Sequence, residues 1–307
     1  MIIKENIPLA PKTTLKIGGD ARFYAEITTK EALKEAYKFG DTNNIPVVIL
    51  GSGSNTIFAD GTINALVIKI VTSEVKINGN EIEVDAGKNL AQLVNELAEL
   101  NLDLSPLTGI PGTAGGAVFG NAGQGCGKIW IDEYVDSICT FEKRLAISDQ
   151  LATAKRSEDG RLAESNIAKN ECGFGYRTSI FKNDKKNSII WSIKLNVPSR
   201  SKEEVQTEIE RLLKKRIESQ PHKRTAGSCF LSLDKENPAW KLIDAANLRG
   251  KQIGGIKISE KHSNFLENTG GATFEDAKNL IAEIKSKIDQ PLPVEMRLIN
   301  NDGEIEN

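Results

Sequence analysis

Apolar residues recur every three to four positions in several segments of the chain, and this spacing predicts amphipathic helices. The predicted helices cover residues 30–39, 89–100, 202–218, 239–246 and 273–288. Thr28 and Thr29 precede the first helix as candidate N-caps, and Thr273 with Asp276 forms a variant of the capping box at the start of the last.

Shorter apolar runs predict strands, and these cover residues 47–50, 66–70 and 188–197. Pairs of short runs on either side of an Asn-Gly-Asn or an Asn-Asp-Gly turn predict β-hairpins, namely 75–77 with 82–84 and 295–299 with 304–306. Taken in order, the elements indicate an α/β beginning and an α+β end rather than one continuous sheet.

Length and charge narrow the classes of function. The chain has 307 residues, which at about 150 residues per domain predicts about two domains with a sizeable core. Its 40 basic and 42 acidic side chains give a formal net charge of −2. We therefore expect no nucleic-acid partner, although the balance allows a local basic pocket for a small anion.

Cysteine usage and hydropathy add two further expectations. The four cysteines form no C-x-x-C pair, so we expect reduced thiols, no metal site and no disulfide scaffold. The N-terminal residues lack the apolar core of a signal peptide and no apolar run is long enough for a bilayer, so we expect a cytoplasmic protein without a membrane partner. Residues 143–169 are charged and weakly patterned, and we expect a surface excursion there.

Two glycine-rich segments are candidate binding sites. Residues 51–55 (Gly-Ser-Gly-Ser-Asn) follow the predicted strand 47–50 and offer unhindered backbone N–H groups of the kind that hold a pyrophosphate. Their spacing matches neither the dinucleotide fingerprint nor a P-loop, and a tight surface turn is the alternative. Residues 107–123 are so rich in glycine that we expect neither a stable helix nor a central strand. They would support a flat ring system or form a mobile loop.

Side chains outside these segments are candidate catalytic or binding groups. Arg177 lies among glycines and aromatics and would grip a carboxylate or enolate, or be an ordinary surface arginine. Ser228 lies among small residues without a G-x-S-x-G elbow, so a serine triad is poorly supported. Glu295 would be either a buried carboxyl that holds a proton or a partner of Arg297. His262 is either a ligand contact or a solvated loop histidine. These residues alone indicate an α/β protein that binds a dinucleotide.

Short motifs along nearly the whole chain resemble, in their order, those of the UDP-N-acetylenolpyruvoylglucosamine reductase family, flavoenzymes of bacterial peptidoglycan precursor synthesis. The matching segments are 14–19 (TLKIGG), 50–55 (LGSGSN), 109–123, 174–179 (FGYRTS), 226–228 (AGS), 253–255 (IGG), 259–262 (SEKH) and 295–297 (EMR). Each motif is weak by itself, but the full series in the family's order is hard to obtain by chance.

The resemblance implies a fold and a domain organisation. The fold class is α+β and α/β: an FAD-binding fold of the vanillyl-alcohol-oxidase type in two subdomains, followed by a C-terminal α+β substrate-binding domain. The first subdomain would cover residues 1–73, with 294–307 returning to it, the second 74–200, and the substrate-binding domain 201–293. The short run after Arg177 resembles the form of the family that lacks the extra tyrosine loop.

The same matching assigns candidate site residues. Non-covalent FAD would be bound by Gly51, Ser52, Gly53, Ser54, Asn55, Gly109, Ile110, Pro111, Gly112, Thr113, Gly116, Asn121 and Gly123. The catalytic group would be Arg177, Ser228 and Glu295, and the substrate would contact Tyr176, His262 and Arg297.

The family's chemistry gives each catalytic residue a role. NADPH reduces the flavin and leaves, and the enolpyruvyl ether of UDP-N-acetylglucosamine takes its place and receives the hydride at its terminal vinyl carbon. Arg177 would then stabilise the enolate, and Ser228 would deliver the proton. Glu295 would share a proton with the substrate carboxylate or orient the group electrostatically. The expected partners are these two small molecules, with no obligate protein partner.

Several positions depart from the family pattern. The family usually has an asparagine a few residues after the serine. Here the corresponding asparagine is Asn237, farther along the chain, and we assign it no role. Cys229 follows the serine, where we expect it to pack, although a thiol beside the acid would be sensitive to oxidation. Residues 125–128 and 143–169 resemble insertions.

Two other functions are alternatives to the reductase. Another flavin oxidase of the same fold would be favoured by a residue placed to bond FAD covalently, and only Cys126 lies by the predicted flavin segments. A catalytically silent nucleotide-binding protein would not need Arg177, Ser228 and Glu295 together.

Overall fold

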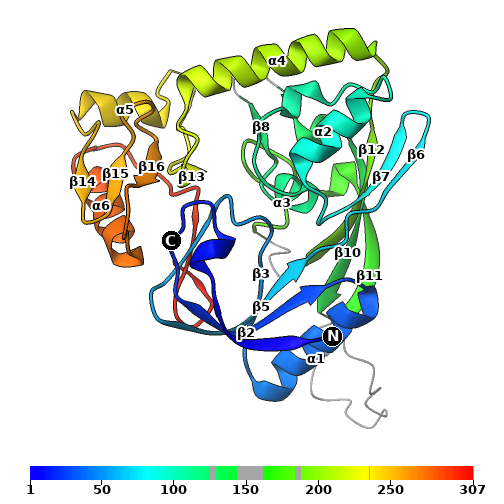
Figure 1. Cartoon of the computed structure of the whole chain (residues 1–307), viewed down its shortest axis with the longest axis horizontal. Helices are drawn as coiled ribbons and strands as arrows, with labels where there is room; N and C mark the ends of the chain where they lie inside the picture. The colour runs from blue at the N-terminus through cyan, green and yellow to red at the C-terminus, as the bar shows by residue number, and fades with distance from the viewer. Residues whose placement is uncertain (125–128, 144–161, 184–187, 235, 307) are drawn as a thin grey trace. The chain divides into compact units, whose positions relative to one another are not determined.

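The computed structural model describes residues 1–124, 129–143, 162–183, 188–234 and 236–306 (Figure 1). The chain forms two compact units, each built from segments that are distant in sequence. The first unit contains Met1–Ile2, Ala25–Gly51 and Ile68–Glu210, and the second contains Ile3–Tyr24, Ser52–Val67 and Arg211–Asn307.

A five-stranded sheet forms the centre of the first unit (Figure 1). Its antiparallel strands lie in the order β11 (Leu162–Ala168), β10 (Val135–Lys143), β12 (Ile189–Asn196), β7 (Glu81–Asp85) and β6 (Val75–Asn78). The predicted hairpin of β6 and β7 is confirmed, with Gly79 at a φ of +60° in its turn.

Strand β11 corrects one prediction. It lies within residues 143–169, where the charged pattern predicts an excursion, yet Leu162 to Ala168 pair with Lys143 to Ser137 of β10. Only Ile167 of β11 is buried, so the strand is held by backbone pairing and carries too few apolar residues for its pattern to be noticed. Residues 144–161 and 125–128 lie outside the described part of the chain.

Two helices cover this sheet. Helix α2 (Leu90–Ala98) is predicted by its apolar spacing, and the side chain of Asn89 caps it by accepting the Gln92 N–H at 3.0 Å. Helix α3 (Ala114–Phe119) packs against β7 and β12. The buried apolar side chains of α2 and α3 join those of the sheet in one core.

Helix α3 contradicts the expectation that residues 107–123 form no helix. The Thr113 hydroxyl caps it by accepting the Gly116 N–H at 3.1 Å. A side chain on Gly115 would place its Cβ 2.7 Å from the Ala86 Cβ, so glycine allows the helix to lie against the sheet. Close packing and a cap therefore stabilise a helix that glycine's intrinsic propensity disfavours.

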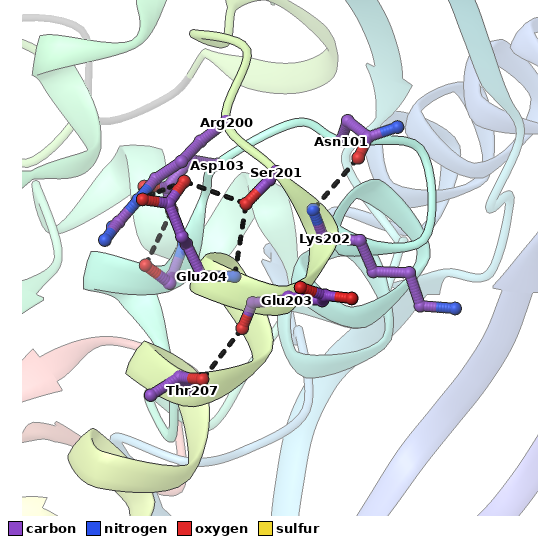
Figure 2. Close-up of polar contacts among 9 residues, drawn as sticks. Asn101, Asp103, Arg200, Ser201, Lys202, Glu203, Glu204 and Thr207 are labelled. Carbon is purple, nitrogen blue, oxygen red and sulfur yellow. Dashed lines mark hydrogen bonds and ion pairs between the residues drawn. The ribbon is translucent and has the colours of Figure 1, made fainter.

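Polar contacts define the beginning of helix α4 (Lys202–Ser219), as Figure 2 shows. The Ser201 hydroxyl accepts the Glu204 N–H at 3.4 Å and donates to the Glu204 carboxylate at 2.8 Å. The Asn101 side chain accepts the Lys202 N–H at 2.9 Å. These contacts satisfy N–H groups that the first turn of a helix leaves without partners, and the helix begins at the predicted residue.

A second sheet contains β1 (Ile3–Pro8), β2 (Asp20–Ile27), β5 (Thr62–Ile70) and β3 (Val47–Ile49) in that order. The chain passes between the two units within β2 and β5. Helix α1 (Lys30–Asn43) packs against β3, and the predicted cap is present because the Thr29 hydroxyl accepts the Ala32 N–H at 3.1 Å.

The second unit holds a small antiparallel sheet in the order β13 (Thr225–Ser228), β16 (Phe265–Asn268), β15 (Ile256–Ile258) and β14 (Gln252–Ile253). Helix α6 (Phe274–Ser286) packs against β14 and β15, and α5 (Ala239–Ala245) precedes them in the chain. The predicted capping box of Thr273 and Asp276 is confirmed, and the Asp276 carboxylate also accepts the Gly255 N–H at 3.1 Å.

The C-terminal segment of the second unit pairs with a strand from the first quarter of the chain. Strand β17 (Arg297–Ile299) lies parallel to β4 (Thr56–Phe58) and antiparallel to β18 (Ile305–Glu306). The predicted C-terminal hairpin is thus confirmed, with Glu295 and Met296 preceding its first strand. The remaining short elements are β8 (Gly123–Gln124), β9 (Ile129–Trp130), and the 3-10 turns η1 (Ala10–Lys12), η2 (Ser105–Leu107), η3 (Ile131–Glu133) and η4 (Lys169–Glu171).

Among the described residues, the structure contains no helix that combines the length and the apolar character needed to cross a lipid bilayer.

Candidate functional site

The 51–55 segment is a loop that follows β3, with Gly51 in the first unit and Ser52 to Asn55 in the second. Gly53 is buried with a φ of +65°, and an added Cβ would lie 2.4 Å from the Lys12 carbonyl oxygen. The Thr14 N–H donates to the Gly53 backbone oxygen at 3.0 Å, which holds the loop against the same segment. Backbone strain and close approach therefore require glycine at position 53.

In the first unit, glycines from both predicted cofactor segments meet at one threonine. An added Cβ on Gly51 would lie 3.2 Å from the Thr113 hydroxyl, and one on Gly116 would lie 3.4 Å from it. Glycine at these positions therefore allows the 51–55 loop and the first turn of α3 to approach the buried Thr113 side chain closely. Thr113 is the N-cap of α3, which positions this hydroxyl at the start of the helix.

The turn before α3 is also shaped by glycine. Gly109 has a φ of +74° and Gly112 a φ of +133°, both in the region that residues with a Cβ rarely adopt. Between them, Ile110 is buried and Pro111 is exposed. The segment is therefore an ordered turn whose apolar residue packs into the core.

Arg177 lies in a tight turn of the first unit. Gly175 and Thr178 exchange two backbone hydrogen bonds of 3.2 Å, which leaves Tyr176 and Arg177 at the tip. Arg177 has a φ of +55°, and its guanidinium donates to the Gly123 oxygen at 2.8 Å. Tyr176 is 53% exposed, so its ring is accessible to a ligand.

Asn121 holds the same turn. Its side chain is buried, donates to the Gly175 oxygen at 3.0 Å and accepts the Asp132 N–H at 3.3 Å. The structure thus brings Arg177 together with Asn121 and Gly123, two of the predicted cofactor residues. The Asn121 side chain therefore shapes the turn that carries Arg177.

Ser228 is the last residue of β13, in the second unit. The pairing of β13 with β16 is irregular between Thr225 and Ser228, and Gly227 between them has a φ of +77°. This bulge re-aims the strand immediately before the half-buried serine.

The backbone of Glu295 is hydrogen-bonded to the residue that follows Ser228. Its N–H donates to the oxygen of Cys229, the residue after Ser228, at 2.8 Å. The Asn55 side chain donates to the backbone carbonyl oxygen of Glu295 at 3.1 Å. The backbone N–H of Arg297 donates to the backbone carbonyl oxygen of Asn55 at 3.0 Å. The structure therefore gathers Ser228, Glu295, Arg297 and the end of the 51–55 loop in the second unit, whereas Arg177 belongs to the first.

The remaining predicted site residues are Arg297 and His262, and burial lowers the pKa of both side chains. Burial lowers the pKa of the Arg297 guanidinium below its ordinary value, although an arginine stays protonated. His262 packs edge-to-face against Phe265 and accepts the Asn264 N–H through Nδ1 at 3.3 Å. Burial lowers the pKa of His262, and both effects favour the neutral ring. His262 is thus a packed histidine, not a solvated one.

The departures from the family pattern also have structural explanations. Cys229 is fully buried, as predicted, and burial raises the pKa of its thiol. Asn237 donates its side chain to the carboxylate of Asp234, so in this chain it caps a local turn. The three described cysteines, Cys139, Cys172 and Cys229, carry free thiols, and Cys126 lies outside the described residues.

Sequence reasoning missed two residues of the second unit that hold Ser228 in place. The Asn264 carbonyl accepts the Cys229 N–H at 2.7 Å, and its side chain pairs with both backbone groups of Phe230 at 3.0 and 2.8 Å. The Thr14 hydroxyl donates to the Thr225 oxygen at 2.6 Å. The TLKIGG motif was a signal for Thr14, but only the structure shows what it contacts.

A hollow of about 250 Å³ in the first unit is poorly suited to an anionic ligand. It lies along the first turns of α4 and is lined by Arg200, Glu203, Glu204, Thr207 and Glu208. Arg200 already pairs with the Asp103 carboxylate at 3.1 Å. The three glutamates would repel phosphate groups.

Two family models match the chain. The model of an FAD binding domain matches residues 21–140, and that of the C-terminal domain of UDP-N-acetylenolpyruvoylglucosamine reductase matches residues 220–298. The first match includes both glycine-rich segments, and the second includes Ser228, His262, Glu295 and Arg297.

Relatives and a solved structure are similar over nearly the full length. A UDP-N-acetylenolpyruvoylglucosamine reductase of Carboxydothermus hydrogenoformans is 34% identical over 302 residues, covering 96% of this chain and 92% of the relative. One from Clostridium botulinum strain Okra is 31% identical, covering 94% and 88%. The crystal structure of the enzyme from Thermus caldophilus has a TM-score of 0.80 at 29% identity, covering 97% and 99%. These findings confirm the predicted fold class, and the chain belongs to the UDP-N-acetylenolpyruvoylglucosamine reductase family.

Proposed function

We propose that this chain is an FAD-containing, NADPH-dependent oxidoreductase of peptidoglycan precursor synthesis. It reduces the enolpyruvyl ether of UDP-N-acetylglucosamine to UDP-N-acetylmuramate. The observation that carries the proposal is family membership over 94–96% of the chain, at identities of 31–34%.

The residues around Thr113 fit an FAD held without a covalent bond. Gly116 is exposed and Gly51 partly exposed, and neither carries a side chain, so a flat or phosphorylated group can approach their backbone closely. We assign the remaining predicted cofactor residues to the same role. Those of the 51–55 loop and of residues 109–113 form the two glycine-rich turns, and Asn121 and Gly123 follow α3 and contact the Arg177 turn. When bound, FAD accepts electrons from NADPH and supplies the hydride for the substrate.

Arg177 is proposed to stabilise the negative charge that develops on the substrate carboxylate and its neighbouring carbon. Its bond to the Gly123 oxygen fixes the plane of the guanidinium, which carries five N–H donors. A fixed donor set stabilises an enolate without reorganising during the reaction. Tyr176, at the same turn, is proposed to contact the substrate.

Ser228 is proposed to give its hydroxyl proton to the carbon that becomes the lactyl stereocentre, and Glu295 to orient or share a proton with the substrate carboxylate. The support is their common attachment to Cys229, which follows Ser228 in the chain and accepts the Glu295 N–H at 2.8 Å. His262 and Arg297 are proposed substrate contacts in the same unit.

We further propose the division of labour that the family resemblance implies. Residues 1–73 with 294–307, and 74–200, would bind FAD, and 201–293 would bind the substrate, in the form of the family without the tyrosine loop. The model of the C-terminal domain at residues 220–298 supports the last assignment. The reaction takes place in the bacterial cytoplasm, where NADPH and the nucleotide sugar are available.

The test is product identity. Purified protein loaded with FAD, given NADPH and the enolpyruvyl substrate, should convert it to a product heavier by two hydrogen atoms in mass spectrometry. Arg177→Lys, Ser228→Ala and Glu295→Gln should each lose most of this conversion while still binding FAD. An unchanged substrate with the wild-type protein would remove the proposed function.

A further inference from the structure

We propose that Thr14 is a positioning residue that holds the proton donor Ser228 in register with the 51–55 loop. The inference rests on the proposed function, because it concerns how Ser228 is aimed. Thr14 lies in the TLKIGG motif and is not among the candidate site residues.

One residue bridges two segments that are far apart in sequence. The backbone N–H of Thr14 donates to the Gly53 carbonyl oxygen at 3.0 Å, and its hydroxyl donates to the backbone carbonyl oxygen of Thr225 at 2.6 Å. The hydroxyl also lies 3.3 Å from the Gly53 oxygen. A hydroxyl has one proton, so the shorter contact with Thr225 receives it. Thr14 therefore connects the loop to the strand that carries Ser228.

The strand that carries Ser228 is irregular where Thr14 contacts it: Thr225 pairs with Glu267 and Ser228 with Phe265, but the pairing between them is interrupted. Between Thr225 and Ser228 the register of β13 on β16 shifts, and Gly227 adopts a φ of +77°. The regular ladder does not fix the strand across this bulge. Thr14 holds one end at Thr225, and Asn264 holds the other end at Cys229.

Thr14 is itself rigidly supported. The side chain of Asn268, on β16, donates to the Leu15 oxygen at 3.0 Å and lies 3.3 Å from the Lys16 oxygen. Leu15 and Ile17 in the same segment are fully buried. The loop also approaches the serine strand directly, since an added Cβ on Gly227 would lie 4.0 Å from the Ser54 oxygen. A bound pyrophosphate that orders the loop would thereby order Ser228.

The test replaces the hydroxyl by a methyl group of the same shape. Thr14→Val in the FAD-loaded protein should slow reoxidation of the reduced flavin by the enolpyruvyl substrate about 10- to 100-fold. Flavin reduction by NADPH should change less than about twofold, and Thr14→Ser should restore the rate, because only the substrate step uses the serine proton. Thr207→Val is the matched control, because the Thr207 hydroxyl also donates to a backbone oxygen, that of Glu203 at 2.8 Å (Figure 2).

A double-mutant cycle separates positioning from general stability. If Thr14 acts through Ser228, adding Thr14→Val to Ser228→Ala should slow reoxidation no further. An equal slowing in both backgrounds, or a wild-type rate in Thr14→Val, would overturn the inference.

Hydrogen exchange of the apoprotein tests the contact without any substrate. Peptides covering residues 225–230 should exchange several-fold faster in Thr14→Val than in the wild type, and Thr14→Ser should be normal. Unchanged exchange in Thr14→Val would refute the positioning role. A wild-type protein that fails to reduce the substrate would instead refute the proposed function, so the two failures are distinguishable.

Discussion

Replacing Gly53 by alanine isolates the cost of the tight 51–55 loop. The left-handed backbone at φ +65° costs an alanine roughly 1–2 kcal/mol. The new Cβ would also lie 2.4 Å from the Lys12 oxygen, about 1 Å inside the 3.4 Å at which ordinary contact begins. Overpacking of this kind costs about 1–3 kcal/mol, so we expect a total of roughly 2–5 kcal/mol.

Gly271 provides a matched control in the same unit. It has the same φ of +65°, and an added Cβ would meet nothing within 4 Å. Gly271→Ala therefore carries the backbone cost alone, about 1–2 kcal/mol. The difference between the two variants measures the close approach of the loop to residues 12 and 13.

The assay is denaturant unfolding of both apoproteins, followed by titration with FAD. We expect Gly53→Ala to lose more free energy of unfolding than Gly271→Ala. We also expect it to bind FAD more weakly, because the loop must move away from Lys12. Equal stabilities together with wild-type FAD affinity in Gly53→Ala would refute the assignment of this loop to the cofactor.

Three further predictions follow from single side chains. Arg177→Lys keeps the charge but loses the planar fork fixed by Gly123, so steady-state turnover should fall about 100-fold or more, and a loss below tenfold would contradict its role. Burial raises the pKa of Cys229, so mass spectrometry after alkylation at pH 8 should show this thiol unmodified until the protein unfolds; rapid labelling of the folded protein would contradict its burial. The pKa of His262 is lowered on folding, so the unfolded chain binds more protons and stability should fall as the pH drops below about 6.5. Melting temperatures of His262→Gln should lose part of this dependence, whereas those of the control His222→Gln, at an exposed histidine, should keep it.

Local signals were enough to predict the elements that carry them. The Thr29 hydroxyl caps α1, and the capping box of Thr273 and Asp276 opens α6, because both depend on residues within one turn of the helix. The hairpin around Gly79 is equally local. Such features need no knowledge of distant contacts.

Elements that depend on tertiary contacts were missed. Helix α3 forms because Gly115 packs closely against Ala86. The low intrinsic helix propensity of glycine gives no sign of this contact. Strand β11 is held by backbone pairing with β10 and has little apolar pattern of its own. The parallel pairing of β4 with β17 joins positions separated by most of the chain.

The same distinction applies to the candidate site. The order of the motifs indicated Ser228 and Glu295. It did not indicate that the backbone of Cys229 connects them, or that the Asn55 side chain donates to the backbone carbonyl oxygen of Glu295. Thr14 was visible only as part of a motif. Its bond to the Thr225 oxygen joins residues that the sequence gives no reason to pair.

The most direct test of the account is an anaerobic experiment on the FAD-loaded protein. NADPH should bleach the flavin absorbance, and addition of enolpyruvyl-UDP-N-acetylglucosamine should restore it without oxygen, with Ser228→Ala slowing the second step alone. A flavin that NADPH reduces but that only oxygen reoxidises would contradict the account, because the fold would then serve a different substrate.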